Sequence, residues 1–253
     1  MNLSIIVPGI RHQNWLSLFQ SAEGAIGNYS FEMIFIGPRG NYDDSLNQKP
    51  NFKFIEDYGT PARCAQIGLL HSSGNFMTWA SDDGTYLAGA LRDCISLFNT
   101  LRVVDGIVIR YREGGNFSDN SVYIAHTHVD MRIFGIPSHY RIAPLGMYNT
   151  HLIKAIGGWD CRYEHLNMCN HDLAFRLQNL GGKLEFSPGE VLDCSWVPWS
   201  GGDGSWVPIK RAYFENDLPL FQQMYSIDQS TRIKIDINNW QNSPAKWEKR
   251  FGV

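Results

Sequence analysis

The chain has 253 residues, of which 43% are hydrophobic and 19% are charged. This composition predicts a globular protein with a substantial core, in one large α/β domain or two small ones. The formal net charge of −3 gives no reason to expect attraction to nucleic acid or to an anionic membrane. No stretch of about 18 apolar residues occurs, so the sequence predicts no transmembrane helix.

The cysteines and the amino terminus indicate the compartment. Five cysteines are present and no two form a C-x-x-C pair, so neither a disulfide framework nor a zinc ribbon is expected. The apolar run at residues 3–7 has no basic region before it, which argues against a signal peptide. We therefore expect reduced thiols and a cytoplasmic location.

Short apolar runs alternate with amphipathic stretches in the first third of the chain. Continuous apolar runs are typical of strands buried on both faces of a parallel sheet. They predict strands at residues 3–7, 31–36, 52–56 and 76–80. Apolar residues at helical spacing predict helices at 14–25 and 62–71. This order of elements is typical of a parallel sheet with right-handed crossovers.

The rest of the chain follows a different pattern. Apolar periodicity predicts helices over residues 87–97, 149–156, 170–180 and 209–225. Strands are predicted at 106–112 and 121–125, paired antiparallel around the turn at Gly114. Since no internal repeat occurs, we expect one domain over residues 1–253.

Two adjacent carboxylates follow the strand predicted at 76–80. Ser81, Asp82, Asp83 and Gly84 form the loop at its carboxyl end, the edge at which open α/β sheets bind ligands. Mg²⁺ and Mn²⁺ prefer oxygen ligands, commonly one or two carboxylates with phosphate oxygens and water. The loop is therefore a candidate site for a divalent cation that also binds a diphosphate. The alternative is an ordinary polar turn.

Further motifs accompany this loop in a specific order and spacing. The first part of the series consists of Ser4-Ile5-Ile6-Val7-Pro8, Arg63, Gly68, Gly74, Asp83, Tyr86, Leu87 and Gly89. The second part consists of Gly157-Gly158-Trp159-Asp160, His171-Asp172-Leu173-Ala174-Phe175-Arg176-Leu177 and Gly181. Over residues 3–185 the series resembles the motifs of family 2 glycosyltransferases.

The resemblance implies a GT-A fold, an α/β fold with a Rossmann-like, mostly parallel central sheet flanked by helices and a small antiparallel acceptor-side portion. It also implies transfer of a sugar, with inversion, from a nucleotide-diphospho-sugar to a hydroxyl of a glycan, a lipid-linked compound or another acceptor. The expected cofactor is Mn²⁺ or Mg²⁺, because departure of the pyrophosphate requires neutralisation of developing charge. Residues 1–100 would bind the donor, 101–207 the acceptor, and 208–253 would form a helical tail.

Roles in donor binding follow from the same resemblance. Asp83 aligns with the second carboxylate of the family's Asp-x-Asp motif and is the expected metal ligand. Ser81 stands where the first carboxylate contacts the ribose, and Asp82 would assist from the middle position. Gly37-Pro38-Arg39 replaces the segment that helps to read the base, which leaves base specificity open. The expected nucleotide-sugar-binding residues are Pro8, Gly9, Arg11, Gly37, Arg39, Arg63, Ser81 and Asp82.

A general base must remove the proton of the acceptor hydroxyl as its oxygen attacks the anomeric carbon. The family uses a Glu-Asp pair, but Cys169 and Asn170 hold those positions here. Asp172 is the remaining carboxylate of the motif and the expected catalytic residue. The competing interpretation is structural, as a charge at a helix N-terminus or as an i,i+4 partner of Arg176.

The expected acceptor-binding residues are Trp159, Asp160 and Glu164, with a buried structural role as the alternative for the tryptophan. Glu164 and His171 are alternative bases. Residues 196–204, rich in glycine and tryptophan, are a candidate lid, and the tail at 240–250 is a candidate for peripheral membrane contact. On an extended strand His126, His128 and Asp130 would share one face, which makes them a candidate zinc site. The alternative is that they are partly exposed strand residues without a metal.

Two other classes compete with the transferase. A non-catalytic nucleotide-sugar or carbohydrate-binding module is favoured by the absence of the Glu-Asp pair and of the first Asp of Asp-x-Asp. A sugar nucleotidyltransferase would usually begin with a glycine-rich, basic loop after the first strand, which Pro8-Gly9-Ile10-Arg11 matches poorly.

Overall fold

The computed structural model describes residues 1–113, 140–194, 210–225 and 231–243. Within these ranges, eight strands form one sheet in the order β3-β2-β1-β4-β7-β6-β8-β5. The strands are β1 (Leu3–Pro8), β2 (Phe31–Gly37), β3 (Phe52–Glu56), β4 (Phe76–Trp79), β5 (Gly84–Tyr86), β6 (Gly106–Glu113), β7 (Gly146–Asn149) and β8 (Leu184–Cys194). The four strands predicted in the first third of the chain are confirmed.

The first four strands are parallel, and β1 lies between β2 and β4. The chain moves outward from β1 to β2 and β3, and then crosses back to the other side of β1 to form β4. The carboxyl ends of β1 and β4 therefore border a topological switch point, where open α/β sheets bind their ligands. Both faces of β1 and β2 are buried, which explains the continuous apolar sequences of these two strands.

The second half of the sheet is mixed. β7 pairs antiparallel with β4 and β6, β8 runs parallel to β6, and β5 closes the edge antiparallel to β8. β6 confirms the strand predicted at 106–112, while its expected partner at 121–125 lies outside the described residues. β8 was not predicted, because Glu185, Pro188, Gly189 and Glu190 interrupt its apolar pattern. The predicted combination of a mostly parallel sheet with an antiparallel portion is confirmed.

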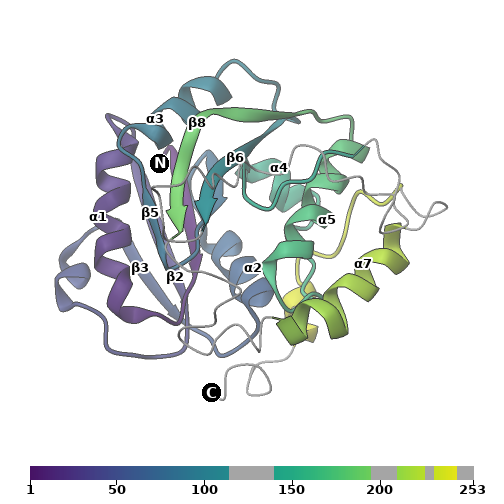
Figure 1. Cartoon of the computed structure of the whole chain (residues 1–253), viewed down its shortest axis with the longest axis horizontal. Helices are drawn as coiled ribbons and strands as arrows, with labels where there is room; N and C mark the ends of the chain where they lie inside the picture. Colours follow the sequence, from purple (N-terminus) through teal and green to yellow (C-terminus); the bar gives the residue numbers. More distant parts are fainter. Residues whose placement is uncertain (114–139, 195–209, 226–230, 244–253) are drawn as a thin grey trace.

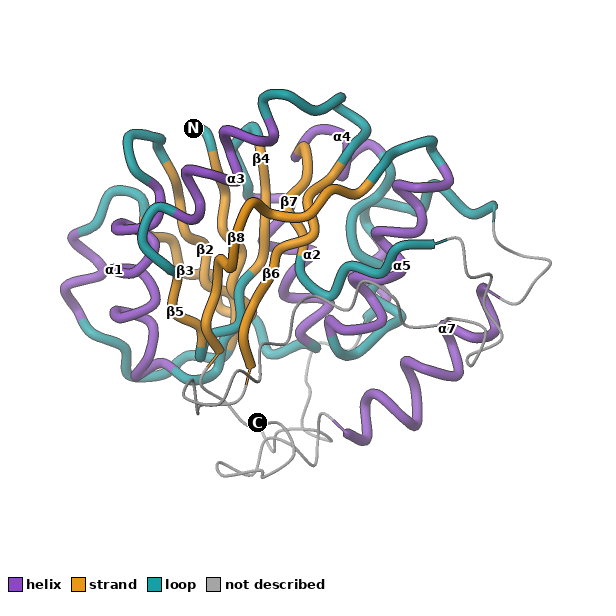
Figure 2. Tube along the Cα trace, turned by 45° about the horizontal axis from the view of Figure 1, so that its top comes forward, coloured by secondary structure: helices purple, strands orange, loops and turns teal. Residues whose placement is uncertain are grey.

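Helices cover both faces of the sheet (Figures 1 and 2). α1 (Trp15–Ile26) and α3 (Ala90–Phe98) pack on one face, in one continuous apolar cluster. α2 (Pro61–His71), α4 (Thr150–Ala155), α5 (Leu166–Asn179) and α7 (Leu218–Tyr225) contribute to a second cluster on the other face. Short turns of 3-10 helix lie at η1 (His12–Asn14), η2 (Asp44–Gln48) and η5 (Asn239–Asn242), and a π-helical turn, η4 (Ala212–Asp217), precedes α7.

The segment at residues 231–243 folds back onto the second layer of helices. The backbone N–H of Ile235 donates to the carbonyl of Ile156 at 3.1 Å, and the Gln66 side chain donates to the carbonyl of Ile237 at 2.8 Å. The segment thereby joins α2 to the loop that follows α4. In the described part of the chain, every helix is too short or too polar to cross a membrane.

Candidate active site

A cavity of about 220 Å³ opens at the carboxyl edge of the sheet, beside the switch point. The first half of the chain contributes the turn after β1 (8–11), the end of β2 (36–38), Tyr58, Gly59, Pro61, Cys64, Trp79 and the loop at 81–83. The second half contributes Tyr111, Pro144, Leu145, His165, Leu166, Asn167, Leu192 and Cys194. The cavity thus joins the predicted donor-binding half to the start of α5. It includes seven predicted site residues: Pro8, Gly9, Arg11, Gly37, Ser81, Asp82 and Asp83.

Asp82 holds the turn after β1 in place. Its Oδ2 accepts the backbone N–H groups of Ile10 and Arg11 at 2.7 and 2.6 Å, and its Oδ1 pairs with the Arg11 guanidinium at 2.7 Å. The carboxylate is buried, and these three bonds occupy both of its oxygens. Asp82 therefore orders one wall of the cavity, and Arg11 brings a positive charge to that wall.

Asp83 is the neighbouring carboxylate on the cavity wall, and the Ser81 hydroxyl donates a hydrogen bond to its Oδ1. Burial raises the pKa of Asp83, although the Ser81 hydrogen bond and the Arg11 charge act in the opposite direction. A bound cation would favour the ionised form of such a carboxylate. The oxygen chemistry of Asp83 fits a hard divalent ion that is also held by phosphates. Among the residues that the structure describes, no group of three or more His, Cys, Asp and Glu side chains forms a metal cluster.

Main-chain atoms form the wall at the ends of β1 and β2. A Cβ atom on Gly37 would lie 2.0 Å from the carbonyl oxygen of Gly9, so a side chain there would push the two strand ends apart. The glycine allows the two backbones to approach closely beside the cavity. Gly37, which the sequence placed at the nucleotide, thus has a steric role at the cavity edge.

Arg63 and Arg39, two predicted donor-binding residues, do not line the cavity. Arg63 pairs with Asp57 at 3.0 Å and donates to the carbonyl of Trp240 at 2.7 Å. Asp57 also accepts the backbone N–H of Gly59 at 2.8 Å, so this pair supports the loop that carries Tyr58 and Gly59. The side chain of Arg39 is 78% exposed and lies 3.3 Å from Glu56.

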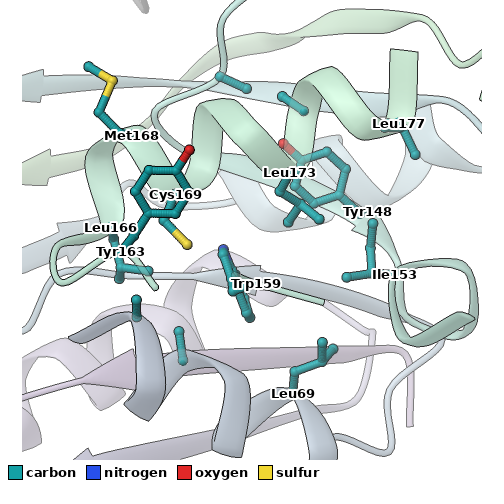
Figure 3. Packing of buried hydrophobic residues seen from close by; sticks show 14 of the residues in the cluster. Leu69, Tyr148, Ile153, Trp159, Tyr163, Leu166, Met168, Cys169, Leu173 and Leu177 are labelled. Carbon is teal, nitrogen blue, oxygen red and sulfur yellow. The ribbon is translucent and has the colours of Figure 1, made fainter. Parts of the chain in front are cut away.

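Trp159, an expected acceptor-binding residue, lies in the core between α5 and α2 (Figure 3). It is fully buried, and its indole N–H donates to the Asn170 side chain at 2.8 Å. The ring contacts core side chains and does not border the cavity, as the alternative of a buried structural tryptophan predicts. Asn170, at a position where the family has an acid, serves here as the hydrogen-bond acceptor for this buried indole.

Asp172, the expected base, is fully buried in an ion network. Its Oδ2 accepts from the Arg176 guanidinium at 2.8 Å, and its Oδ1 accepts from the Tyr225 hydroxyl at 2.6 Å and from Arg232 at 2.9 Å. The ion pair with Arg176 is the i,i+4 pair of the competing interpretation. Both carboxylate oxygens are engaged and Asp172 does not line the cavity, an arrangement that fits the structural interpretation better than the role of a base.

Asp160, expected at the acceptor, belongs to the same network. It pairs with Arg162 at 2.7 Å and also with Arg232, which therefore bridges Asp160 and Asp172. Burial alone would raise the pKa of Asp160, but the hydrogen bond from Arg162 and the charge of Arg232 lower it to about 2. The carboxylate is ionised at neutral pH and stabilises the fold, away from the cavity.

Glu164 and His171, the alternative bases, do not line the cavity either. His171 is buried within α5, and Glu164 precedes the helix by two residues. The residue between Glu164 and the helix, His165, does line the cavity and was not predicted. The sequence prediction began the helix at residue 170, whereas α5 begins at Leu166, and this error hid the position of His165 at the helix terminus.

Three predicted features lie outside the described residues: the His126, His128 and Asp130 set, the candidate lid at 196–204, and the basic end of the tail after residue 243.

The fold is similar to that of solved structures of S. aureus TarS. The chain matches TarS with a TM-score of 0.57 and 16% identity, over 82% of this chain and 38% of TarS. It matches TarS 1–349 in complex with UDP with a TM-score of 0.61 and 14% identity, over 95% of this chain and 68% of that one. For TarS 1–349 in complex with UDP-GlcNAc, the TM-score is 0.54 and the identity 17%, over 76% and 58% of the two chains.

These likenesses confirm the expected GT-A-like fold. The chain spans well under half of the length of TarS, the first of these three. No protein-family model matches the sequence, and no curated protein matches it. The assignment to family 2 therefore stays a resemblance.

Proposed function

We propose that this protein is a glycosyltransferase that uses a nucleotide-diphospho-sugar and binds its donor in the cavity at the carboxyl ends of β1 and β4. One observation carries the proposal: Asp83, Ser81 and the Asp82–Arg11 pair meet in a cavity at the topological switch point of the sheet. The fold supports it, because TarS, of similar fold, has been solved with UDP and with UDP-GlcNAc. Uracil is therefore the first base to test.

We propose that Asp83 would hold Mn²⁺ or Mg²⁺ together with the donor diphosphate. The ion would neutralise charge on the departing diphosphate. Ser81 would orient the Asp83 carboxylate through its hydrogen bond, and Arg11 would add a second positive charge near it. In this arrangement Asp82 supports Arg11 and is not itself a metal ligand.

The reaction we propose is a direct displacement with inversion onto a hydroxyl acceptor. The acceptor oxygen forms a bond to the anomeric carbon as the bond to the diphosphate breaks, and a base takes the hydroxyl proton. Asp172 is not carried forward as that base, because its oxygens are bound to Arg176, Tyr225 and Arg232. The same observation favours the second candidate, a non-catalytic nucleotide-sugar-binding module.

Thermal unfolding with UDP, GDP, dTDP and CDP, each with and without Mn²⁺, tests the binding site. A nucleotide at about 100 times its Kd should add about 2.7 kcal/mol of stability, or roughly 5–11 °C in Tm. We expect one nucleotide to give this shift, with Mn²⁺ required for its full size. Replacement of Asp83 by Asn should abolish the increment that depends on metal and lower turnover of the nucleotide-sugar about 100-fold or more.

Asp93→Asn is the matched control, because Asp93 is a half-exposed acid on α3 and does not line the cavity. A Tm that no nucleotide raises would contradict the proposed function. A shift that is equal in wild type and Asp83→Asn would retain nucleotide binding and reject the metal site. Tight binding without any turnover across acceptors would select the binding module.

A further inference from the structure

His165 stands at the junction of α5 and the cavity. It is the N-cap residue of α5, and its Nδ1 accepts the backbone N–H of Asn167 at 3.2 Å. His165 and the two residues that follow it all line the cavity. The first turn of α5 therefore borders the ligand space, with the partial positive charge of a helix N-terminus.

The hydrogen bond at Nδ1 determines the form of the ring. An Nδ1 that accepts from a backbone N–H carries no proton, so a neutral imidazole must carry its proton on Nε2. Burial lowers the pKa of His165 to about 4, which keeps the ring neutral at physiological pH. Within the described ranges, no protein group accepts a hydrogen bond from Nε2 of His165.

Asp217 fixes the backbone of His165 by a hydrogen bond. This fully buried carboxylate of the π-helical turn accepts the backbone N–H groups of Glu164 and His165, each at 2.8 Å. Asp217 thus fixes the entry into α5, and the Nδ1 bond fixes the ring. A residue that is fixed through its backbone and through one ring nitrogen, and that carries one donor group at a cavity wall, is preorganised to bind an acceptor atom.

We propose that His165 is a donor-substrate-binding residue whose Nε2–H donates a hydrogen bond to an oxygen of the nucleotide-sugar in the cavity. This inference rests on the proposed function and names a contact that the motif resemblance does not include. Because the imidazole is neutral and its Nδ1 is engaged, it binds and orients the substrate and does not act as the general base.

Two substitutions separate the capping role of His165 from its binding role. His165→Asn places an amide where Nδ1 lies, so it keeps the helix cap and removes the distal donor. His165→Gln extends an amide N–H toward the position of Nε2, so it keeps the donor and weakens the cap. Each variant is titrated with UDP and with UDP-GlcNAc by calorimetry, and its Tm is measured without nucleotide.

For His165→Asn we expect a Tm within about 2 °C of wild type and an affinity for the nucleotide that is about three- to tenfold weaker. For His165→Gln we expect a Tm lower by about 2–4 °C and an affinity within threefold of wild type. The ¹⁵N chemical shifts of the His165 ring should identify the Nε2–H tautomer at pH 7.

Unchanged affinity in His165→Asn would overturn the inference and leave His165 as a helix cap. A ring protonated on Nδ1 at pH 7 would overturn it as well. If wild-type protein binds neither UDP nor any other nucleoside diphosphate, the proposed function fails and this inference fails with it. Binding by wild type and equal binding by the Asn variant would reject the role of His165 alone.

Discussion

The loop at residues 81–83 and the network around Asp160 and Asp172 both place carboxylates beside arginines, but in different surroundings. Asp83 lines a cavity, and its Oδ1 accepts a hydrogen bond from the Ser81 hydroxyl. Asp172 is fully buried between two guanidiniums and a phenol. A carboxylate that is saturated by internal donors stabilises the fold, whereas one at a cavity wall can bind an ion or a substrate.

The network around Asp160 and Asp172 also connects segments that are distant in the chain. Arg176 is fully buried, and besides Asp172 it donates to the backbone carbonyls of Ile156 and Gly158. The network thus joins α5 to the loop after α4, and Arg232 adds the segment at 231–243. Asp160 and Asp172 therefore hold distant segments of the fold together.

The largest effect on stability is expected from Asp172→Asn. This change leaves Arg176 buried without its carboxylate partner, which should lower the free energy of unfolding by about 3–5 kcal/mol. Urea unfolding measures the loss, with Asp93→Asn, at a half-exposed acid, as the control. Nucleotide affinity of the protein that remains folded should be unchanged. Loss of turnover at near-wild-type stability would instead support Asp172 as the base. It would contradict the assignment of the Asp160 and Asp172 network to a purely structural role.

A smaller effect is expected at acid pH from Asp160. Its pKa of about 2 in the folded state lies below its ordinary value of 3.8, so the ionised carboxylate stabilises the fold above about pH 4. That contribution, about 2 kcal/mol, should disappear as the pH falls from about 4 through 2. In Asp160→Asn, the unfolding free energy should therefore depend less steeply on pH in this window. Equal slopes in wild type and variant would show that the carboxylate is not stabilised by Arg162 and Arg232.

The smallest effect is expected from Arg39→Ala. The side chain is 78% exposed and its pair with Glu56 is solvated, so stability should change by less than about 0.5 kcal/mol. Affinity for UDP should stay within twofold of wild type, which thermal shift and calorimetry can measure. A larger loss would place Arg39 in the donor site beside Arg11 and extend the binding region beyond the cavity described.

Much of the first half of the molecule could be predicted from sequence. Strands buried on two faces must be apolar throughout, and this requirement marks β1, β2 and β4 in the chain. The position of residues 81–83 at a carboxyl strand end follows from the same pattern. The second half was predicted less well, because Glu185, Pro188, Gly189 and Glu190 interrupt the apolar pattern of β8, and because β8 pairs with β6 across about 80 positions of sequence.

The amino-acid sequence by itself determined the alternation of strands and helices, the loop that bears Asp82 and Asp83, and the possibility of an i,i+4 pair between Asp172 and Arg176. Those features depend on local periodicity and spacing. The tertiary structure decided which acids face a cavity, since that depends on partners far away in the chain: Arg11 for Asp82, and Tyr225 and Arg232 for Asp172. It also brought Asp217 to the start of α5 and His165 to the cavity wall, because only packing of the folded layers places these segments together.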